Sequence, residues 1–234
     1  EYGVYAPIGG TLPKGVHTEE VMTESISGSM VLAALERVAG DLVSHAEELR
    51  ELDAAIGDGD LGITITIGCG ALREAIATLD AGDIGAALSK AGMAFNRKAA
   101  STFGALVATM GMRAGREAKG RADLSLADLA AMCRAAAEGV KERGKSDVGQ
   151  KTLLDALVPA AAALETAAAE GASIAEALGR AARAAEAGAR ATEEMKSQVG
   201  RASWFTDRTA GVRDPGAQAI ALAFASLAAY ASGE

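Results

Sequence analysis

Apolar residues recur at steps of three and four along most of this chain, a spacing that places them on one face of an α-helix. The chain has 234 residues, of which 56 are alanine and only 3% are aromatic. A buried core must therefore be built from small and aliphatic side chains. Alanine is the best helix former and loses no side-chain entropy on burial, so this composition favours closely packed helices.

Seven or eight helices are predicted from this periodicity. The first begins at Met30 and has apolar residues at Leu32, Leu35, Val38, Leu42, Val43 and Leu49. Further helices are predicted over 64–79, over 83–115 as one helix or two with a break near 101–104, over 125–144, 152–169 and 173–196, and from 214 onward. The short connections favour an antiparallel helical assembly, with one all-helical domain over 30–234.

Local signals support these boundaries. Ser125, with Asp128 three residues later, is typical of a helix cap, and Asp214 before Pro215 combines a capping residue with a proline that suits the first turn. The β-branched run 63–67 alone would suggest a strand, but no partner strand is predicted, so a helix is favoured. Residues 1–29, with two prolines and several glycines, are predicted to be an extended or disordered leader or linker.

The charge of the chain limits its partners. A net charge of −8 and a sequence pI near 5.0 argue against nucleic acid or an anionic membrane. No apolar run has the length of a membrane-spanning helix. Cys69 and Cys133 are far apart in sequence and are predicted to be free thiols in a reducing compartment, which favours the cytoplasm. An anionic ligand would need local compensation, for example from a bound divalent metal.

Three aspartates form the strongest local signal. Asp53, Asp58 and Asp60 lie within eight residues and alternate with glycines in the sequence Leu-Asp-Ala-Ala-Ile-Gly-Asp-Gly-Asp-Leu-Gly. Their spacing does not stack them on a helix face, but the glycines allow the backbone to fold back so that the carboxylates converge. Hard oxygen ligands suit Mg²⁺ or Ca²⁺. An EF-hand is excluded because Ile63 occupies the position that requires glycine; a solvated acidic turn is the remaining alternative.

Residues 139–146 match the phosphate-loop pattern G-x-x-x-x-G-K-[ST] letter for letter. A true phosphate loop follows a buried strand and precedes a helix. Here the preceding residues have helical periodicity, and Lys141, Glu142 and Arg143 are too bulky and charged for a loop that wraps phosphate with its amides. The end of a helix followed by a loop is the better interpretation.

The segment 200–216 is a further candidate. Arg201 and Arg213 could meet phosphate oxygens, and a helix that opens at Pro215 would offer free amides and the positive end of its dipole. Exposed loop charges are the alternative interpretation at this point.

Together these motifs resemble the nucleotide-binding L subunit or domain of dihydroxyacetone kinases. The matching stretches are Leu-Asp-Ala-Ala-Ile-Gly-Asp-Gly-Asp-Leu-Gly, Gly-Gln-Lys-Thr-Leu-Leu-Asp-Ala-Leu-Val-Pro-Ala, Gly-Arg-Ala-Ser-Trp-Phe-Thr-Asp-Arg-Thr-Ala-Gly and Arg-Asp-Pro-Gly-Ala, which cover the chain from about residue 30 to its end. The resemblance implies an all-helical barrel of eight antiparallel helices, with ADP or ATP held at one rim through two Mg²⁺ ions.

The resemblance also implies roles for individual residues. It assigns Asp53, Asp58 and Asp60 as metal ligands that take part in catalysis, and Arg201 as a group that stabilises phosphate oxygens. It implies nucleotide contacts at Gly62, Thr64, Thr102, Gly104, Gly144, Leu153, Arg201, Asp214 and Gly216. The implied activity is phosphoryl transfer to dihydroxyacetone or a tetrulose such as erythrulose, held on a separate K subunit. The donor is either ATP or a phosphotransferase-system phosphocarrier, and a homodimer is a further partner to test.

The chain departs from the family's usual pattern at three points. Leu61 replaces a histidine, Phe103 lies in a loop that is usually rich in glycine and serine, and Gln150 replaces an aspartate. These changes leave two other hypotheses open: a regulatory subunit with structurally bound nucleotide, and a stand-alone metal-dependent phosphatase or cyclase on nucleotides.

Overall fold

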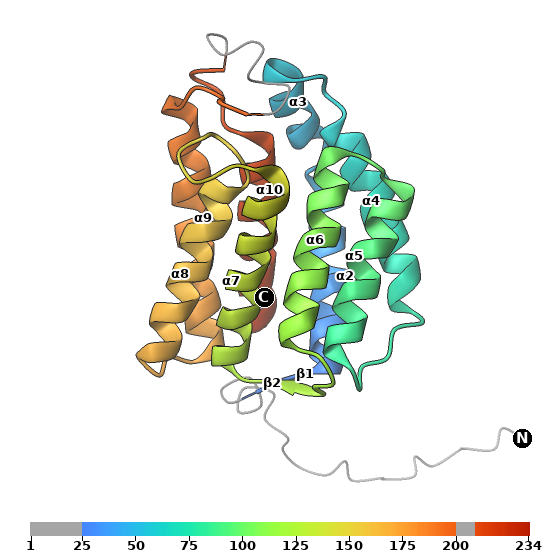
Figure 1. Ribbon diagram of the computed structural model, residues 1–234. Helices are drawn as coiled ribbons and strands as arrows, with labels where there is room; N and C mark the ends of the chain where they lie inside the picture. The colour runs from blue at the N-terminus through green and yellow to red at the C-terminus, as the bar shows by residue number, and fades with distance from the viewer. Residues whose placement is uncertain (1–24, 200–208) are drawn as a thin grey trace, which may run out of the picture.

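The computed structural model describes residues 25–199 and 209–234, and this part of the chain is almost entirely helical (Figure 1). Its helices are α2 (Gly28–Ser44), α3 (Ala46–Ile56), α4 (Leu61–Ile76), α5 (Ile84–Lys98), α6 (Thr102–Glu117), α7 (Leu126–Gly144), α8 (Leu154–Ala169), α9 (Ile174–Ala191) and α10 (Pro215–Ser232). A 3₁₀ turn, η1 (Thr192–Glu194), follows α9. The all-α prediction is confirmed.

Eight of these helices form a closed ring. Helices α4 to α10 each pack against the next in chain order, while α10 packs against α2 and α2 packs against α4. The short helix α3 lies outside this circuit and packs on α4 and α10. The described residues therefore form the antiparallel barrel of eight helices that the resemblance implied.

The antiparallel order separates the connections into two groups (Figure 1). The connections α3–α4, α5–α6, α7–α8 and α9–α10 lie at one end of the barrel, which we call the cleft end. The connections α4–α5, α6–α7 and α8–α9 lie at the other end, which we call the capped end. Because consecutive helices reverse direction, the aspartate-rich turn after α3, the connection that contains Lys151 and the start of α10 all lie at the cleft end.

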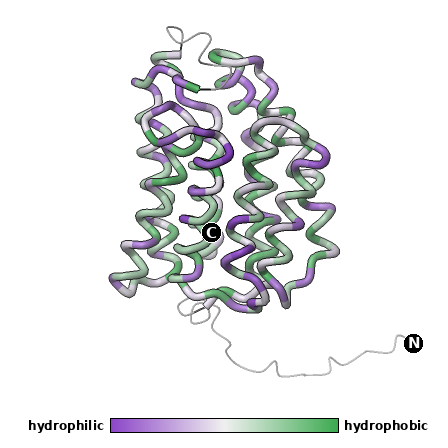
Figure 2. Tube along the Cα trace, viewed as in Figure 1, coloured by the Kyte–Doolittle hydropathy of each residue, from purple (hydrophilic) through white to green (hydrophobic). Residues whose placement is uncertain are grey.

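Small side chains allow the helices to approach closely. On α9, Ala177, Ala181, Ala185 and Ala189 recur every four residues with 0% exposure and form a stripe that packs against α8. This stripe belongs to a core cluster that also contains Leu154, Leu164 and Phe224. The helices in view carry both hydrophobic and hydrophilic stretches (Figure 2), as amphipathic helices around a common core require.

The capped end holds a two-stranded ribbon that the helical prediction did not include. Strand β1 (Ile26–Ser27) pairs antiparallel with β2 (Asp123–Leu124), so that Ile26 is opposite Leu124. The predicted extended region 1–29 thus contains β1 at residues 26–27, and α2 begins at Gly28 rather than at Met30. Residues 1–24 of that region lie outside the described part of the chain.

The helix predicted from Met30 past Leu49 is two helices in the structure. Helix α2 ends before His45, whose backbone N–H donates to both Asp41 O and Leu42 O, and α3 begins at Ala46. Glu47 and Glu48 lie in the first turn of α3, where the positive end of the helix dipole favours them. The break turns the chain across the end of the barrel and carries Asp53 toward the cleft.

Most other boundaries differ from the predictions by a few residues. Helix α4 covers the β-branched run and ends at Ile76. It begins earlier than predicted, at Leu61, because this residue is buried and already packs in the core. The region 83–115 is two helices, α5 and α6, that meet near Ser101. The helix predicted over 173–196 ends as α9 at Ala191 and tightens into η1. Helix α7 ends at Gly144 as predicted, and α10 begins at Pro215 as predicted.

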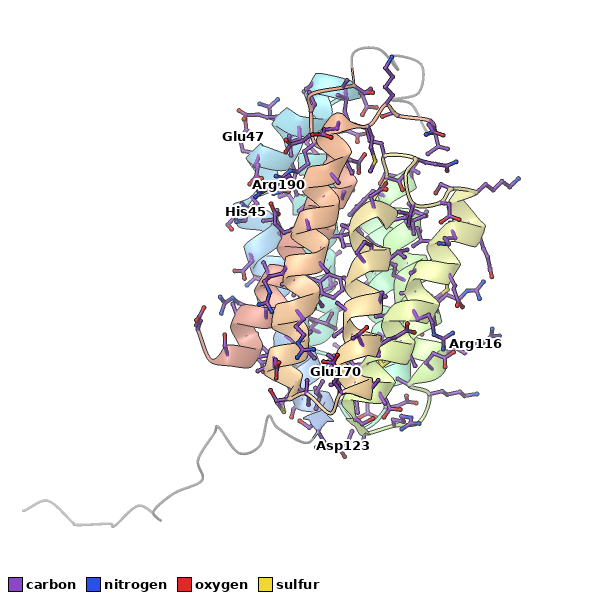
Figure 3. The ribbon with its side chains drawn as sticks, turned by 90° about the vertical axis from the view of Figure 1, so that its left-hand side faces the viewer. His45, Glu47, Arg116, Asp123, Glu170 and Arg190 are labelled. Atoms are coloured by element: carbon purple, nitrogen blue, oxygen red, sulfur yellow. The ribbon has the colours of Figure 1, made fainter. Side chains whose placement is uncertain are left out.

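Charged side chains lie mainly on the outer surface, as Glu47 and Arg116 do in Figure 3. Exposed ion pairs such as Arg73–Glu36 and Arg134–Glu165 join neighbouring helices. No described helix is both long enough and apolar enough to span a membrane. Cys69 and Cys133 are free, and burial raises the pKa of each thiol to about 12.

Candidate metal and nucleotide site

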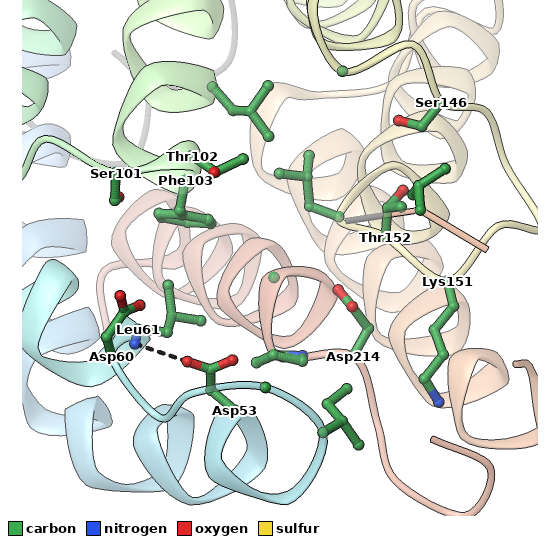
Figure 4. Close-up of a pocket in the computed structure, with 18 of the residues that line it drawn as sticks. Asp53, Asp60, Leu61, Ser101, Thr102, Phe103, Ser146, Lys151, Thr152 and Asp214 are labelled. Atoms are coloured by element: carbon green, nitrogen blue, oxygen red, sulfur yellow. Dashed lines mark hydrogen bonds between the residues drawn. The ribbon is translucent and has the colours of Figure 1, made fainter. Parts of the chain in front are cut away.

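A cleft of about 290 Å³ opens at the cleft end (Figure 4). Residues from all four connections at this end line it, together with the first turns of α4, α6 and α10. The predicted site residues among them are Asp53, Asp58, Asp60, Thr102, Gly144, Leu153, Asp214 and Gly216. Tertiary folding thus brings residues 53 and 216 of the sequence to one cavity.

The three aspartates converge as the glycine spacing predicted. One carboxylate oxygen from each of Asp53, Asp58 and Asp60 lies within 4.8 Å of the others. Asp53 is fixed at the end of α3, because its Oδ2 accepts from Leu61 N at 3.0 Å. Gly59 has a φ of 76°, a left-handed conformation that lets the chain turn back between Asp58 and Asp60. An all-oxygen set of three carboxylates fits Mg²⁺ or Ca²⁺.

Four helices point their N-termini into the cleft. Leu61, Thr102, Leu153 and Pro215 line the cleft and lie at or beside the first residues of α4, α6, α8 and α10. A helix N-terminus carries unsatisfied N–H groups and a partial positive charge, so it favours an anion. The cleft therefore joins a carboxylate group suited to a cation with helix ends suited to an anion, the combination that a metal–polyphosphate ligand requires.

Gly62 and Gly104 were predicted to contact the nucleotide, but in the structure they allow close packing of helices. A Cβ at Gly62 would lie 2.3 Å from Ala46 O, and one at Gly104 would lie 2.2 Å from Ala99 O. Neither glycine lines the cleft, and neither does the buried Thr64. Gly62 allows α4 to touch α3, and Gly104 allows α6 to touch the end of α5. A direct contact of these three residues with a ligand stays a prediction.

Arg201 lies outside the described residues. Arg213, the other arginine considered for phosphate, is engaged with protein groups. Its guanidinium contacts Glu186 and Glu193 at 3.1 Å each and donates to Gln218 Oε1 at 2.6 Å. Gln218 in turn donates to Glu48 of α3 at 2.7 Å. Arg213 therefore links α9 and η1 to α10 and, through Gln218, to α3.

Asp214 caps α10 as predicted and is a titratable group in the cleft wall. Its Oδ2 accepts from Ala217 N at 2.7 Å. Burial raises the pKa of Asp214 to about 7, with a further increase from Asp155, while the bond from Ala217 and the charge of Lys151 act in the opposite direction. A carboxyl group that titrates near neutral pH is common in functional sites.

Sequence reasoning missed two buried charged residues, Lys151 and Asp155. Lys151 is 2% exposed, and its Nζ donates to four backbone carbonyls, while Asp155 accepts from Gly149 N at 2.6 Å and Thr152 N at 2.7 Å. Burial lowers the pKa of Lys151 from its usual value, opposed by Asp214 and Glu193. Residues 149–160 were one of the stretches that carry the resemblance, but nothing in that stretch indicated that both charged side chains are buried.

The phosphate-loop pattern at 139–146 does not form a phosphate loop. Residues 139–144 are the last turns of α7, and Lys145 adopts a left-handed conformation just after the helix. Gly144 and Ser146 nevertheless line the cleft. The interpretation as a helix end followed by a loop is confirmed.

Fold and cleft together define a helical barrel with one end suited to both a cation and an anion. The family model described as the DAK2 domain matches residues 55–229. The chain therefore belongs to the DAK2 domain family.

Relatives support this assignment. The chain is 32% identical over 204 residues to the ADP-binding subunit DhaL of the PEP-dependent dihydroxyacetone kinase of Escherichia coli (strain K12), covering 87% of this chain and 97% of that one. It is 36% identical over 205 residues to D-erythrulose kinase of Mycolicibacterium smegmatis, covering 85% of this chain but 35% of that protein. A solved dihydroxyacetone kinase of C. freundii, in complex with AMP-PNP and Mg²⁺, matches with a TM-score of 0.67 and 25% identity, over 98% of this chain and 38% of that one. Each of these three proteins is named as a kinase or as a subunit of one.

Proposed function

We propose that this chain is the nucleotide-binding part of a kinase for short ketoses, with residues 30–234 as its nucleotide-binding domain. It binds ADP or ATP with two Mg²⁺ ions and passes phosphate to dihydroxyacetone or a tetrulose on a separate K subunit. The observation that carries the proposal is the convergence of Asp53, Asp58 and Asp60, within 4.8 Å, at a cleft that four helix N-termini enter. The names of the relatives support the nucleotide and the kinase reaction.

Each group of residues has a role in this proposal. Asp53, oriented by the Leu61 amide, holds the metal ions together with Asp58 and Asp60. Bound Mg²⁺ would neutralise phosphate charge and polarise the transferred phosphoryl group. The first turns of α6 and α10 direct N–H groups toward the phosphates. Arg201 adds a positive charge that stabilises the phosphate oxygens. Apolar residues of the cleft such as Phe103 and Leu153 offer a surface for the base. Phosphoryl transfer depends mainly on such positioning and charge neutralisation.

The binding step is tested by calorimetry. We expect ADP to bind in the presence of Mg²⁺ and to bind much more weakly after chelation with EDTA, because the aspartates repel uncompensated phosphates. ADP binding that is unaffected by EDTA would contradict the metal-dependent site.

The catalytic step is tested by reconstitution. The chain is mixed with its K partner, ATP and either dihydroxyacetone or erythrulose, and phosphorylated ketose is measured. Product formation excludes a purely regulatory subunit, an alternative that Leu61 keeps open because its side chain lines the cleft beside Asp60. Turnover of a nucleotide without any partner would instead indicate a phosphatase or cyclase.

The phosphoryl donor is tested by nucleotide exchange. Freely exchanging ATP indicates a direct donor, whereas ADP that stays bound through purification indicates rephosphorylation by a phosphocarrier. The free thiols of Cys69, which is buried, and Cys133, which is partly buried, support the proposal that the protein works in a reducing compartment such as the cytoplasm. Sedimentation of the isolated chain tests the homodimer.

A further inference from the structure

Lys151 is a buried cation that the proposed reaction does not use. Lys151 lies in the connection between α7 and α8 and lines the cleft. Such a lysine would ordinarily be interpreted as a phosphate ligand. In Figure 4, however, its side chain extends away from Asp53 and Asp60. Its ammonium is bonded to backbone carbonyls instead.

The four carbonyls come from both ends of one segment. Lys151 Nζ donates to Thr192 O at 2.7 Å and Met195 O at 3.2 Å, just after α9. It also donates to Thr209 O at 2.7 Å and to Val212 O, just before α10. An ammonium has three hydrogens, so all of its donor capacity is used within this group. We call Lys151 and these four carbonyls the lysine clamp.

Other hydrogen bonds join the same two ends. Ser197 N donates to Thr209 Oγ1 at 3.0 Å, Gly211 N donates to Glu193 O at 2.7 Å, and Asp214 N donates to Thr192 Oγ1 at 2.8 Å. Four carbonyl dipoles that point at one another without a cation would be unfavourable in a buried position. The lysine clamp is therefore the group that allows these ends to meet.

The lysine clamp lies directly beneath the cleft wall. Val199 lies four residues after Met195, and Asp214 lies two residues after Val212. Val199 and Asp214 both line the cleft. Lys151 itself has a φ of 59°, an unusual conformation for a residue with a side chain, which the surrounding contacts must stabilise. Asp155 supports the same turn through Gly149 N and Thr152 N.

We propose that Lys151 is a positioning residue of the nucleotide cleft: by joining both ends of the segment between α9 and α10, it sets the position of Val199 and of the Asp214–Gly216 start of α10. The proposal rests on the proposed function, because it assigns to Lys151 a purpose in nucleotide binding. Lys151 does not itself contact the nucleotide.

The test compares Lys151→Met, which removes the donors but keeps the length of the side chain, with Lys151→Arg, which keeps the charge. Lys90→Met, an exposed lysine on α5, is the matched control. Three quantities are measured: the Kd of Mg-ADP, the Tm without nucleotide, and hydrogen exchange of peptides 192–199 and 209–216 without nucleotide.

We expect Lys151→Met to raise the Kd of Mg-ADP by about tenfold or more, the range typical for residues that orient a site from behind. Exchange in both peptides should become faster, while peptides of α4 and α5 stay unchanged. Lys151→Arg should recover part of the affinity, and Lys90→Met should match the wild type. Faster exchange with a wild-type Kd would overturn the proposal in favour of a purely structural role, and unchanged exchange would overturn the lysine clamp itself.

The wild-type protein gives a second test if Lys151→Met does not fold. Because one ammonium holds both ends, peptides 192–199 and 209–216 should open together, with the same opening free energy. Independent opening would overturn the proposal. If the wild type binds no Mg-ADP, the proposed function fails, and the exchange data still decide whether the lysine clamp exists.

Discussion

The two ends of the barrel differ in how completely their helix N-termini are capped by side chains. At the capped end, α2, α5, α7 and α9 all begin with a side chain that accepts from the first turn, supplied by Ser27, Asp83, Ser125 and Ser173. At the cleft end, α6 and α10 are capped by Ser101 and Asp214, but Asp60 and Leu153 make no side-chain cap for α4 and α8.

The ends also differ in how their charges are arranged. At the capped end, Asp128 completes a capping box with Ser125 and contacts Arg121 at 3.0 Å near the surface. At the cleft end, three carboxylates approach within 4.8 Å of one another, and Lys151 and Asp155 are each 2% exposed. Like charges so close together repel unless a cation separates them. The comparison indicates that charged residues at the capped end stabilise the fold, whereas those at the cleft end include a carboxylate cluster whose repulsion favours a cation.

The largest effect is expected from removing carboxylates at the cleft end. Asp58→Ala/Asp60→Ala should weaken Mg-ADP binding by at least ~100-fold, since even residues that only orient a metal ligand are typically worth 10- to 100-fold. Calorimetry measures the affinity, and thermal unfolding without nucleotide checks that the variant is still folded.

Asp123→Ala removes one exposed carboxylate at the capped end and is the control for lost negative charge. It should leave the affinity for Mg-ADP unchanged. Equal losses of affinity in the two variants would mean that the distinction between the ends is wrong.

A smaller effect is expected from filling a close helix contact. Gly62→Ala should lower the free energy of unfolding by about 1–3 kcal/mol, the usual result of overpacking, because the new Cβ would lie 2.3 Å from Ala46 O. Gly70→Ala, on the same helix with no atom within 4 Å of its new Cβ, should instead be neutral or stabilising. Urea unfolding compares the two, and equal stabilities would show that α3 and α4 do not pack this closely.

Removing one helix cap at the capped end should lower the stability of the fold moderately and leave nucleotide binding unchanged. Ser125→Ala breaks the capping box of α7 and should cost about 1 kcal/mol of folding free energy. The Kd of Mg-ADP should not change, because Ser125 is at the capped end. A change in Kd would show that the two ends are energetically coupled.

A further effect is expected in the pH dependence of stability. The folded pKa of Asp214 is raised to about 7 from 3.8, so between these values the folded state keeps a proton that the unfolded state has lost. The contribution of Asp214 to stability is thus present below pH 4 and is lost as pH rises toward 7. Asp214→Asn preserves the cap and should remove this component. Urea unfolding at pH 4.5 and 7.5 measures the difference, and parallel profiles for both proteins would contradict the raised pKa.

Much of the fold was predictable because its signals are local. The cap of α7 at Ser125 and the start of α10 at Asp214–Pro215 follow from residues within one turn of each helix end. The break at His45 was missed because the apolar spacing continues through it, and tertiary packing of α3 on α4 and α10 decides it. The ribbon of β1 and β2 was missed because each strand has two residues, too few for any periodicity.

The candidate site was predictable in part for the same reason. Asp53, Asp58 and Asp60 are near one another in sequence, and Gly59 makes their convergence a local event. Gly62 and Gly104 were predicted as ligand contacts, but the atoms that require them to be glycine belong to other elements or to the end of the preceding helix. A sequence cannot distinguish a glycine that admits a ligand from one that admits a neighbouring backbone.

The sequence by itself determined that the chain forms alanine-rich antiparallel helices and that three carboxylates meet at one turn, since periodicity, capping and glycine turns act within a few residues. The tertiary structure alone decided that Lys151 is buried among carbonyls of Thr192 and Thr209, 41 and 58 residues away. Burial of a charge depends on which distant groups surround it, and only the closed ring of helices brings those groups together.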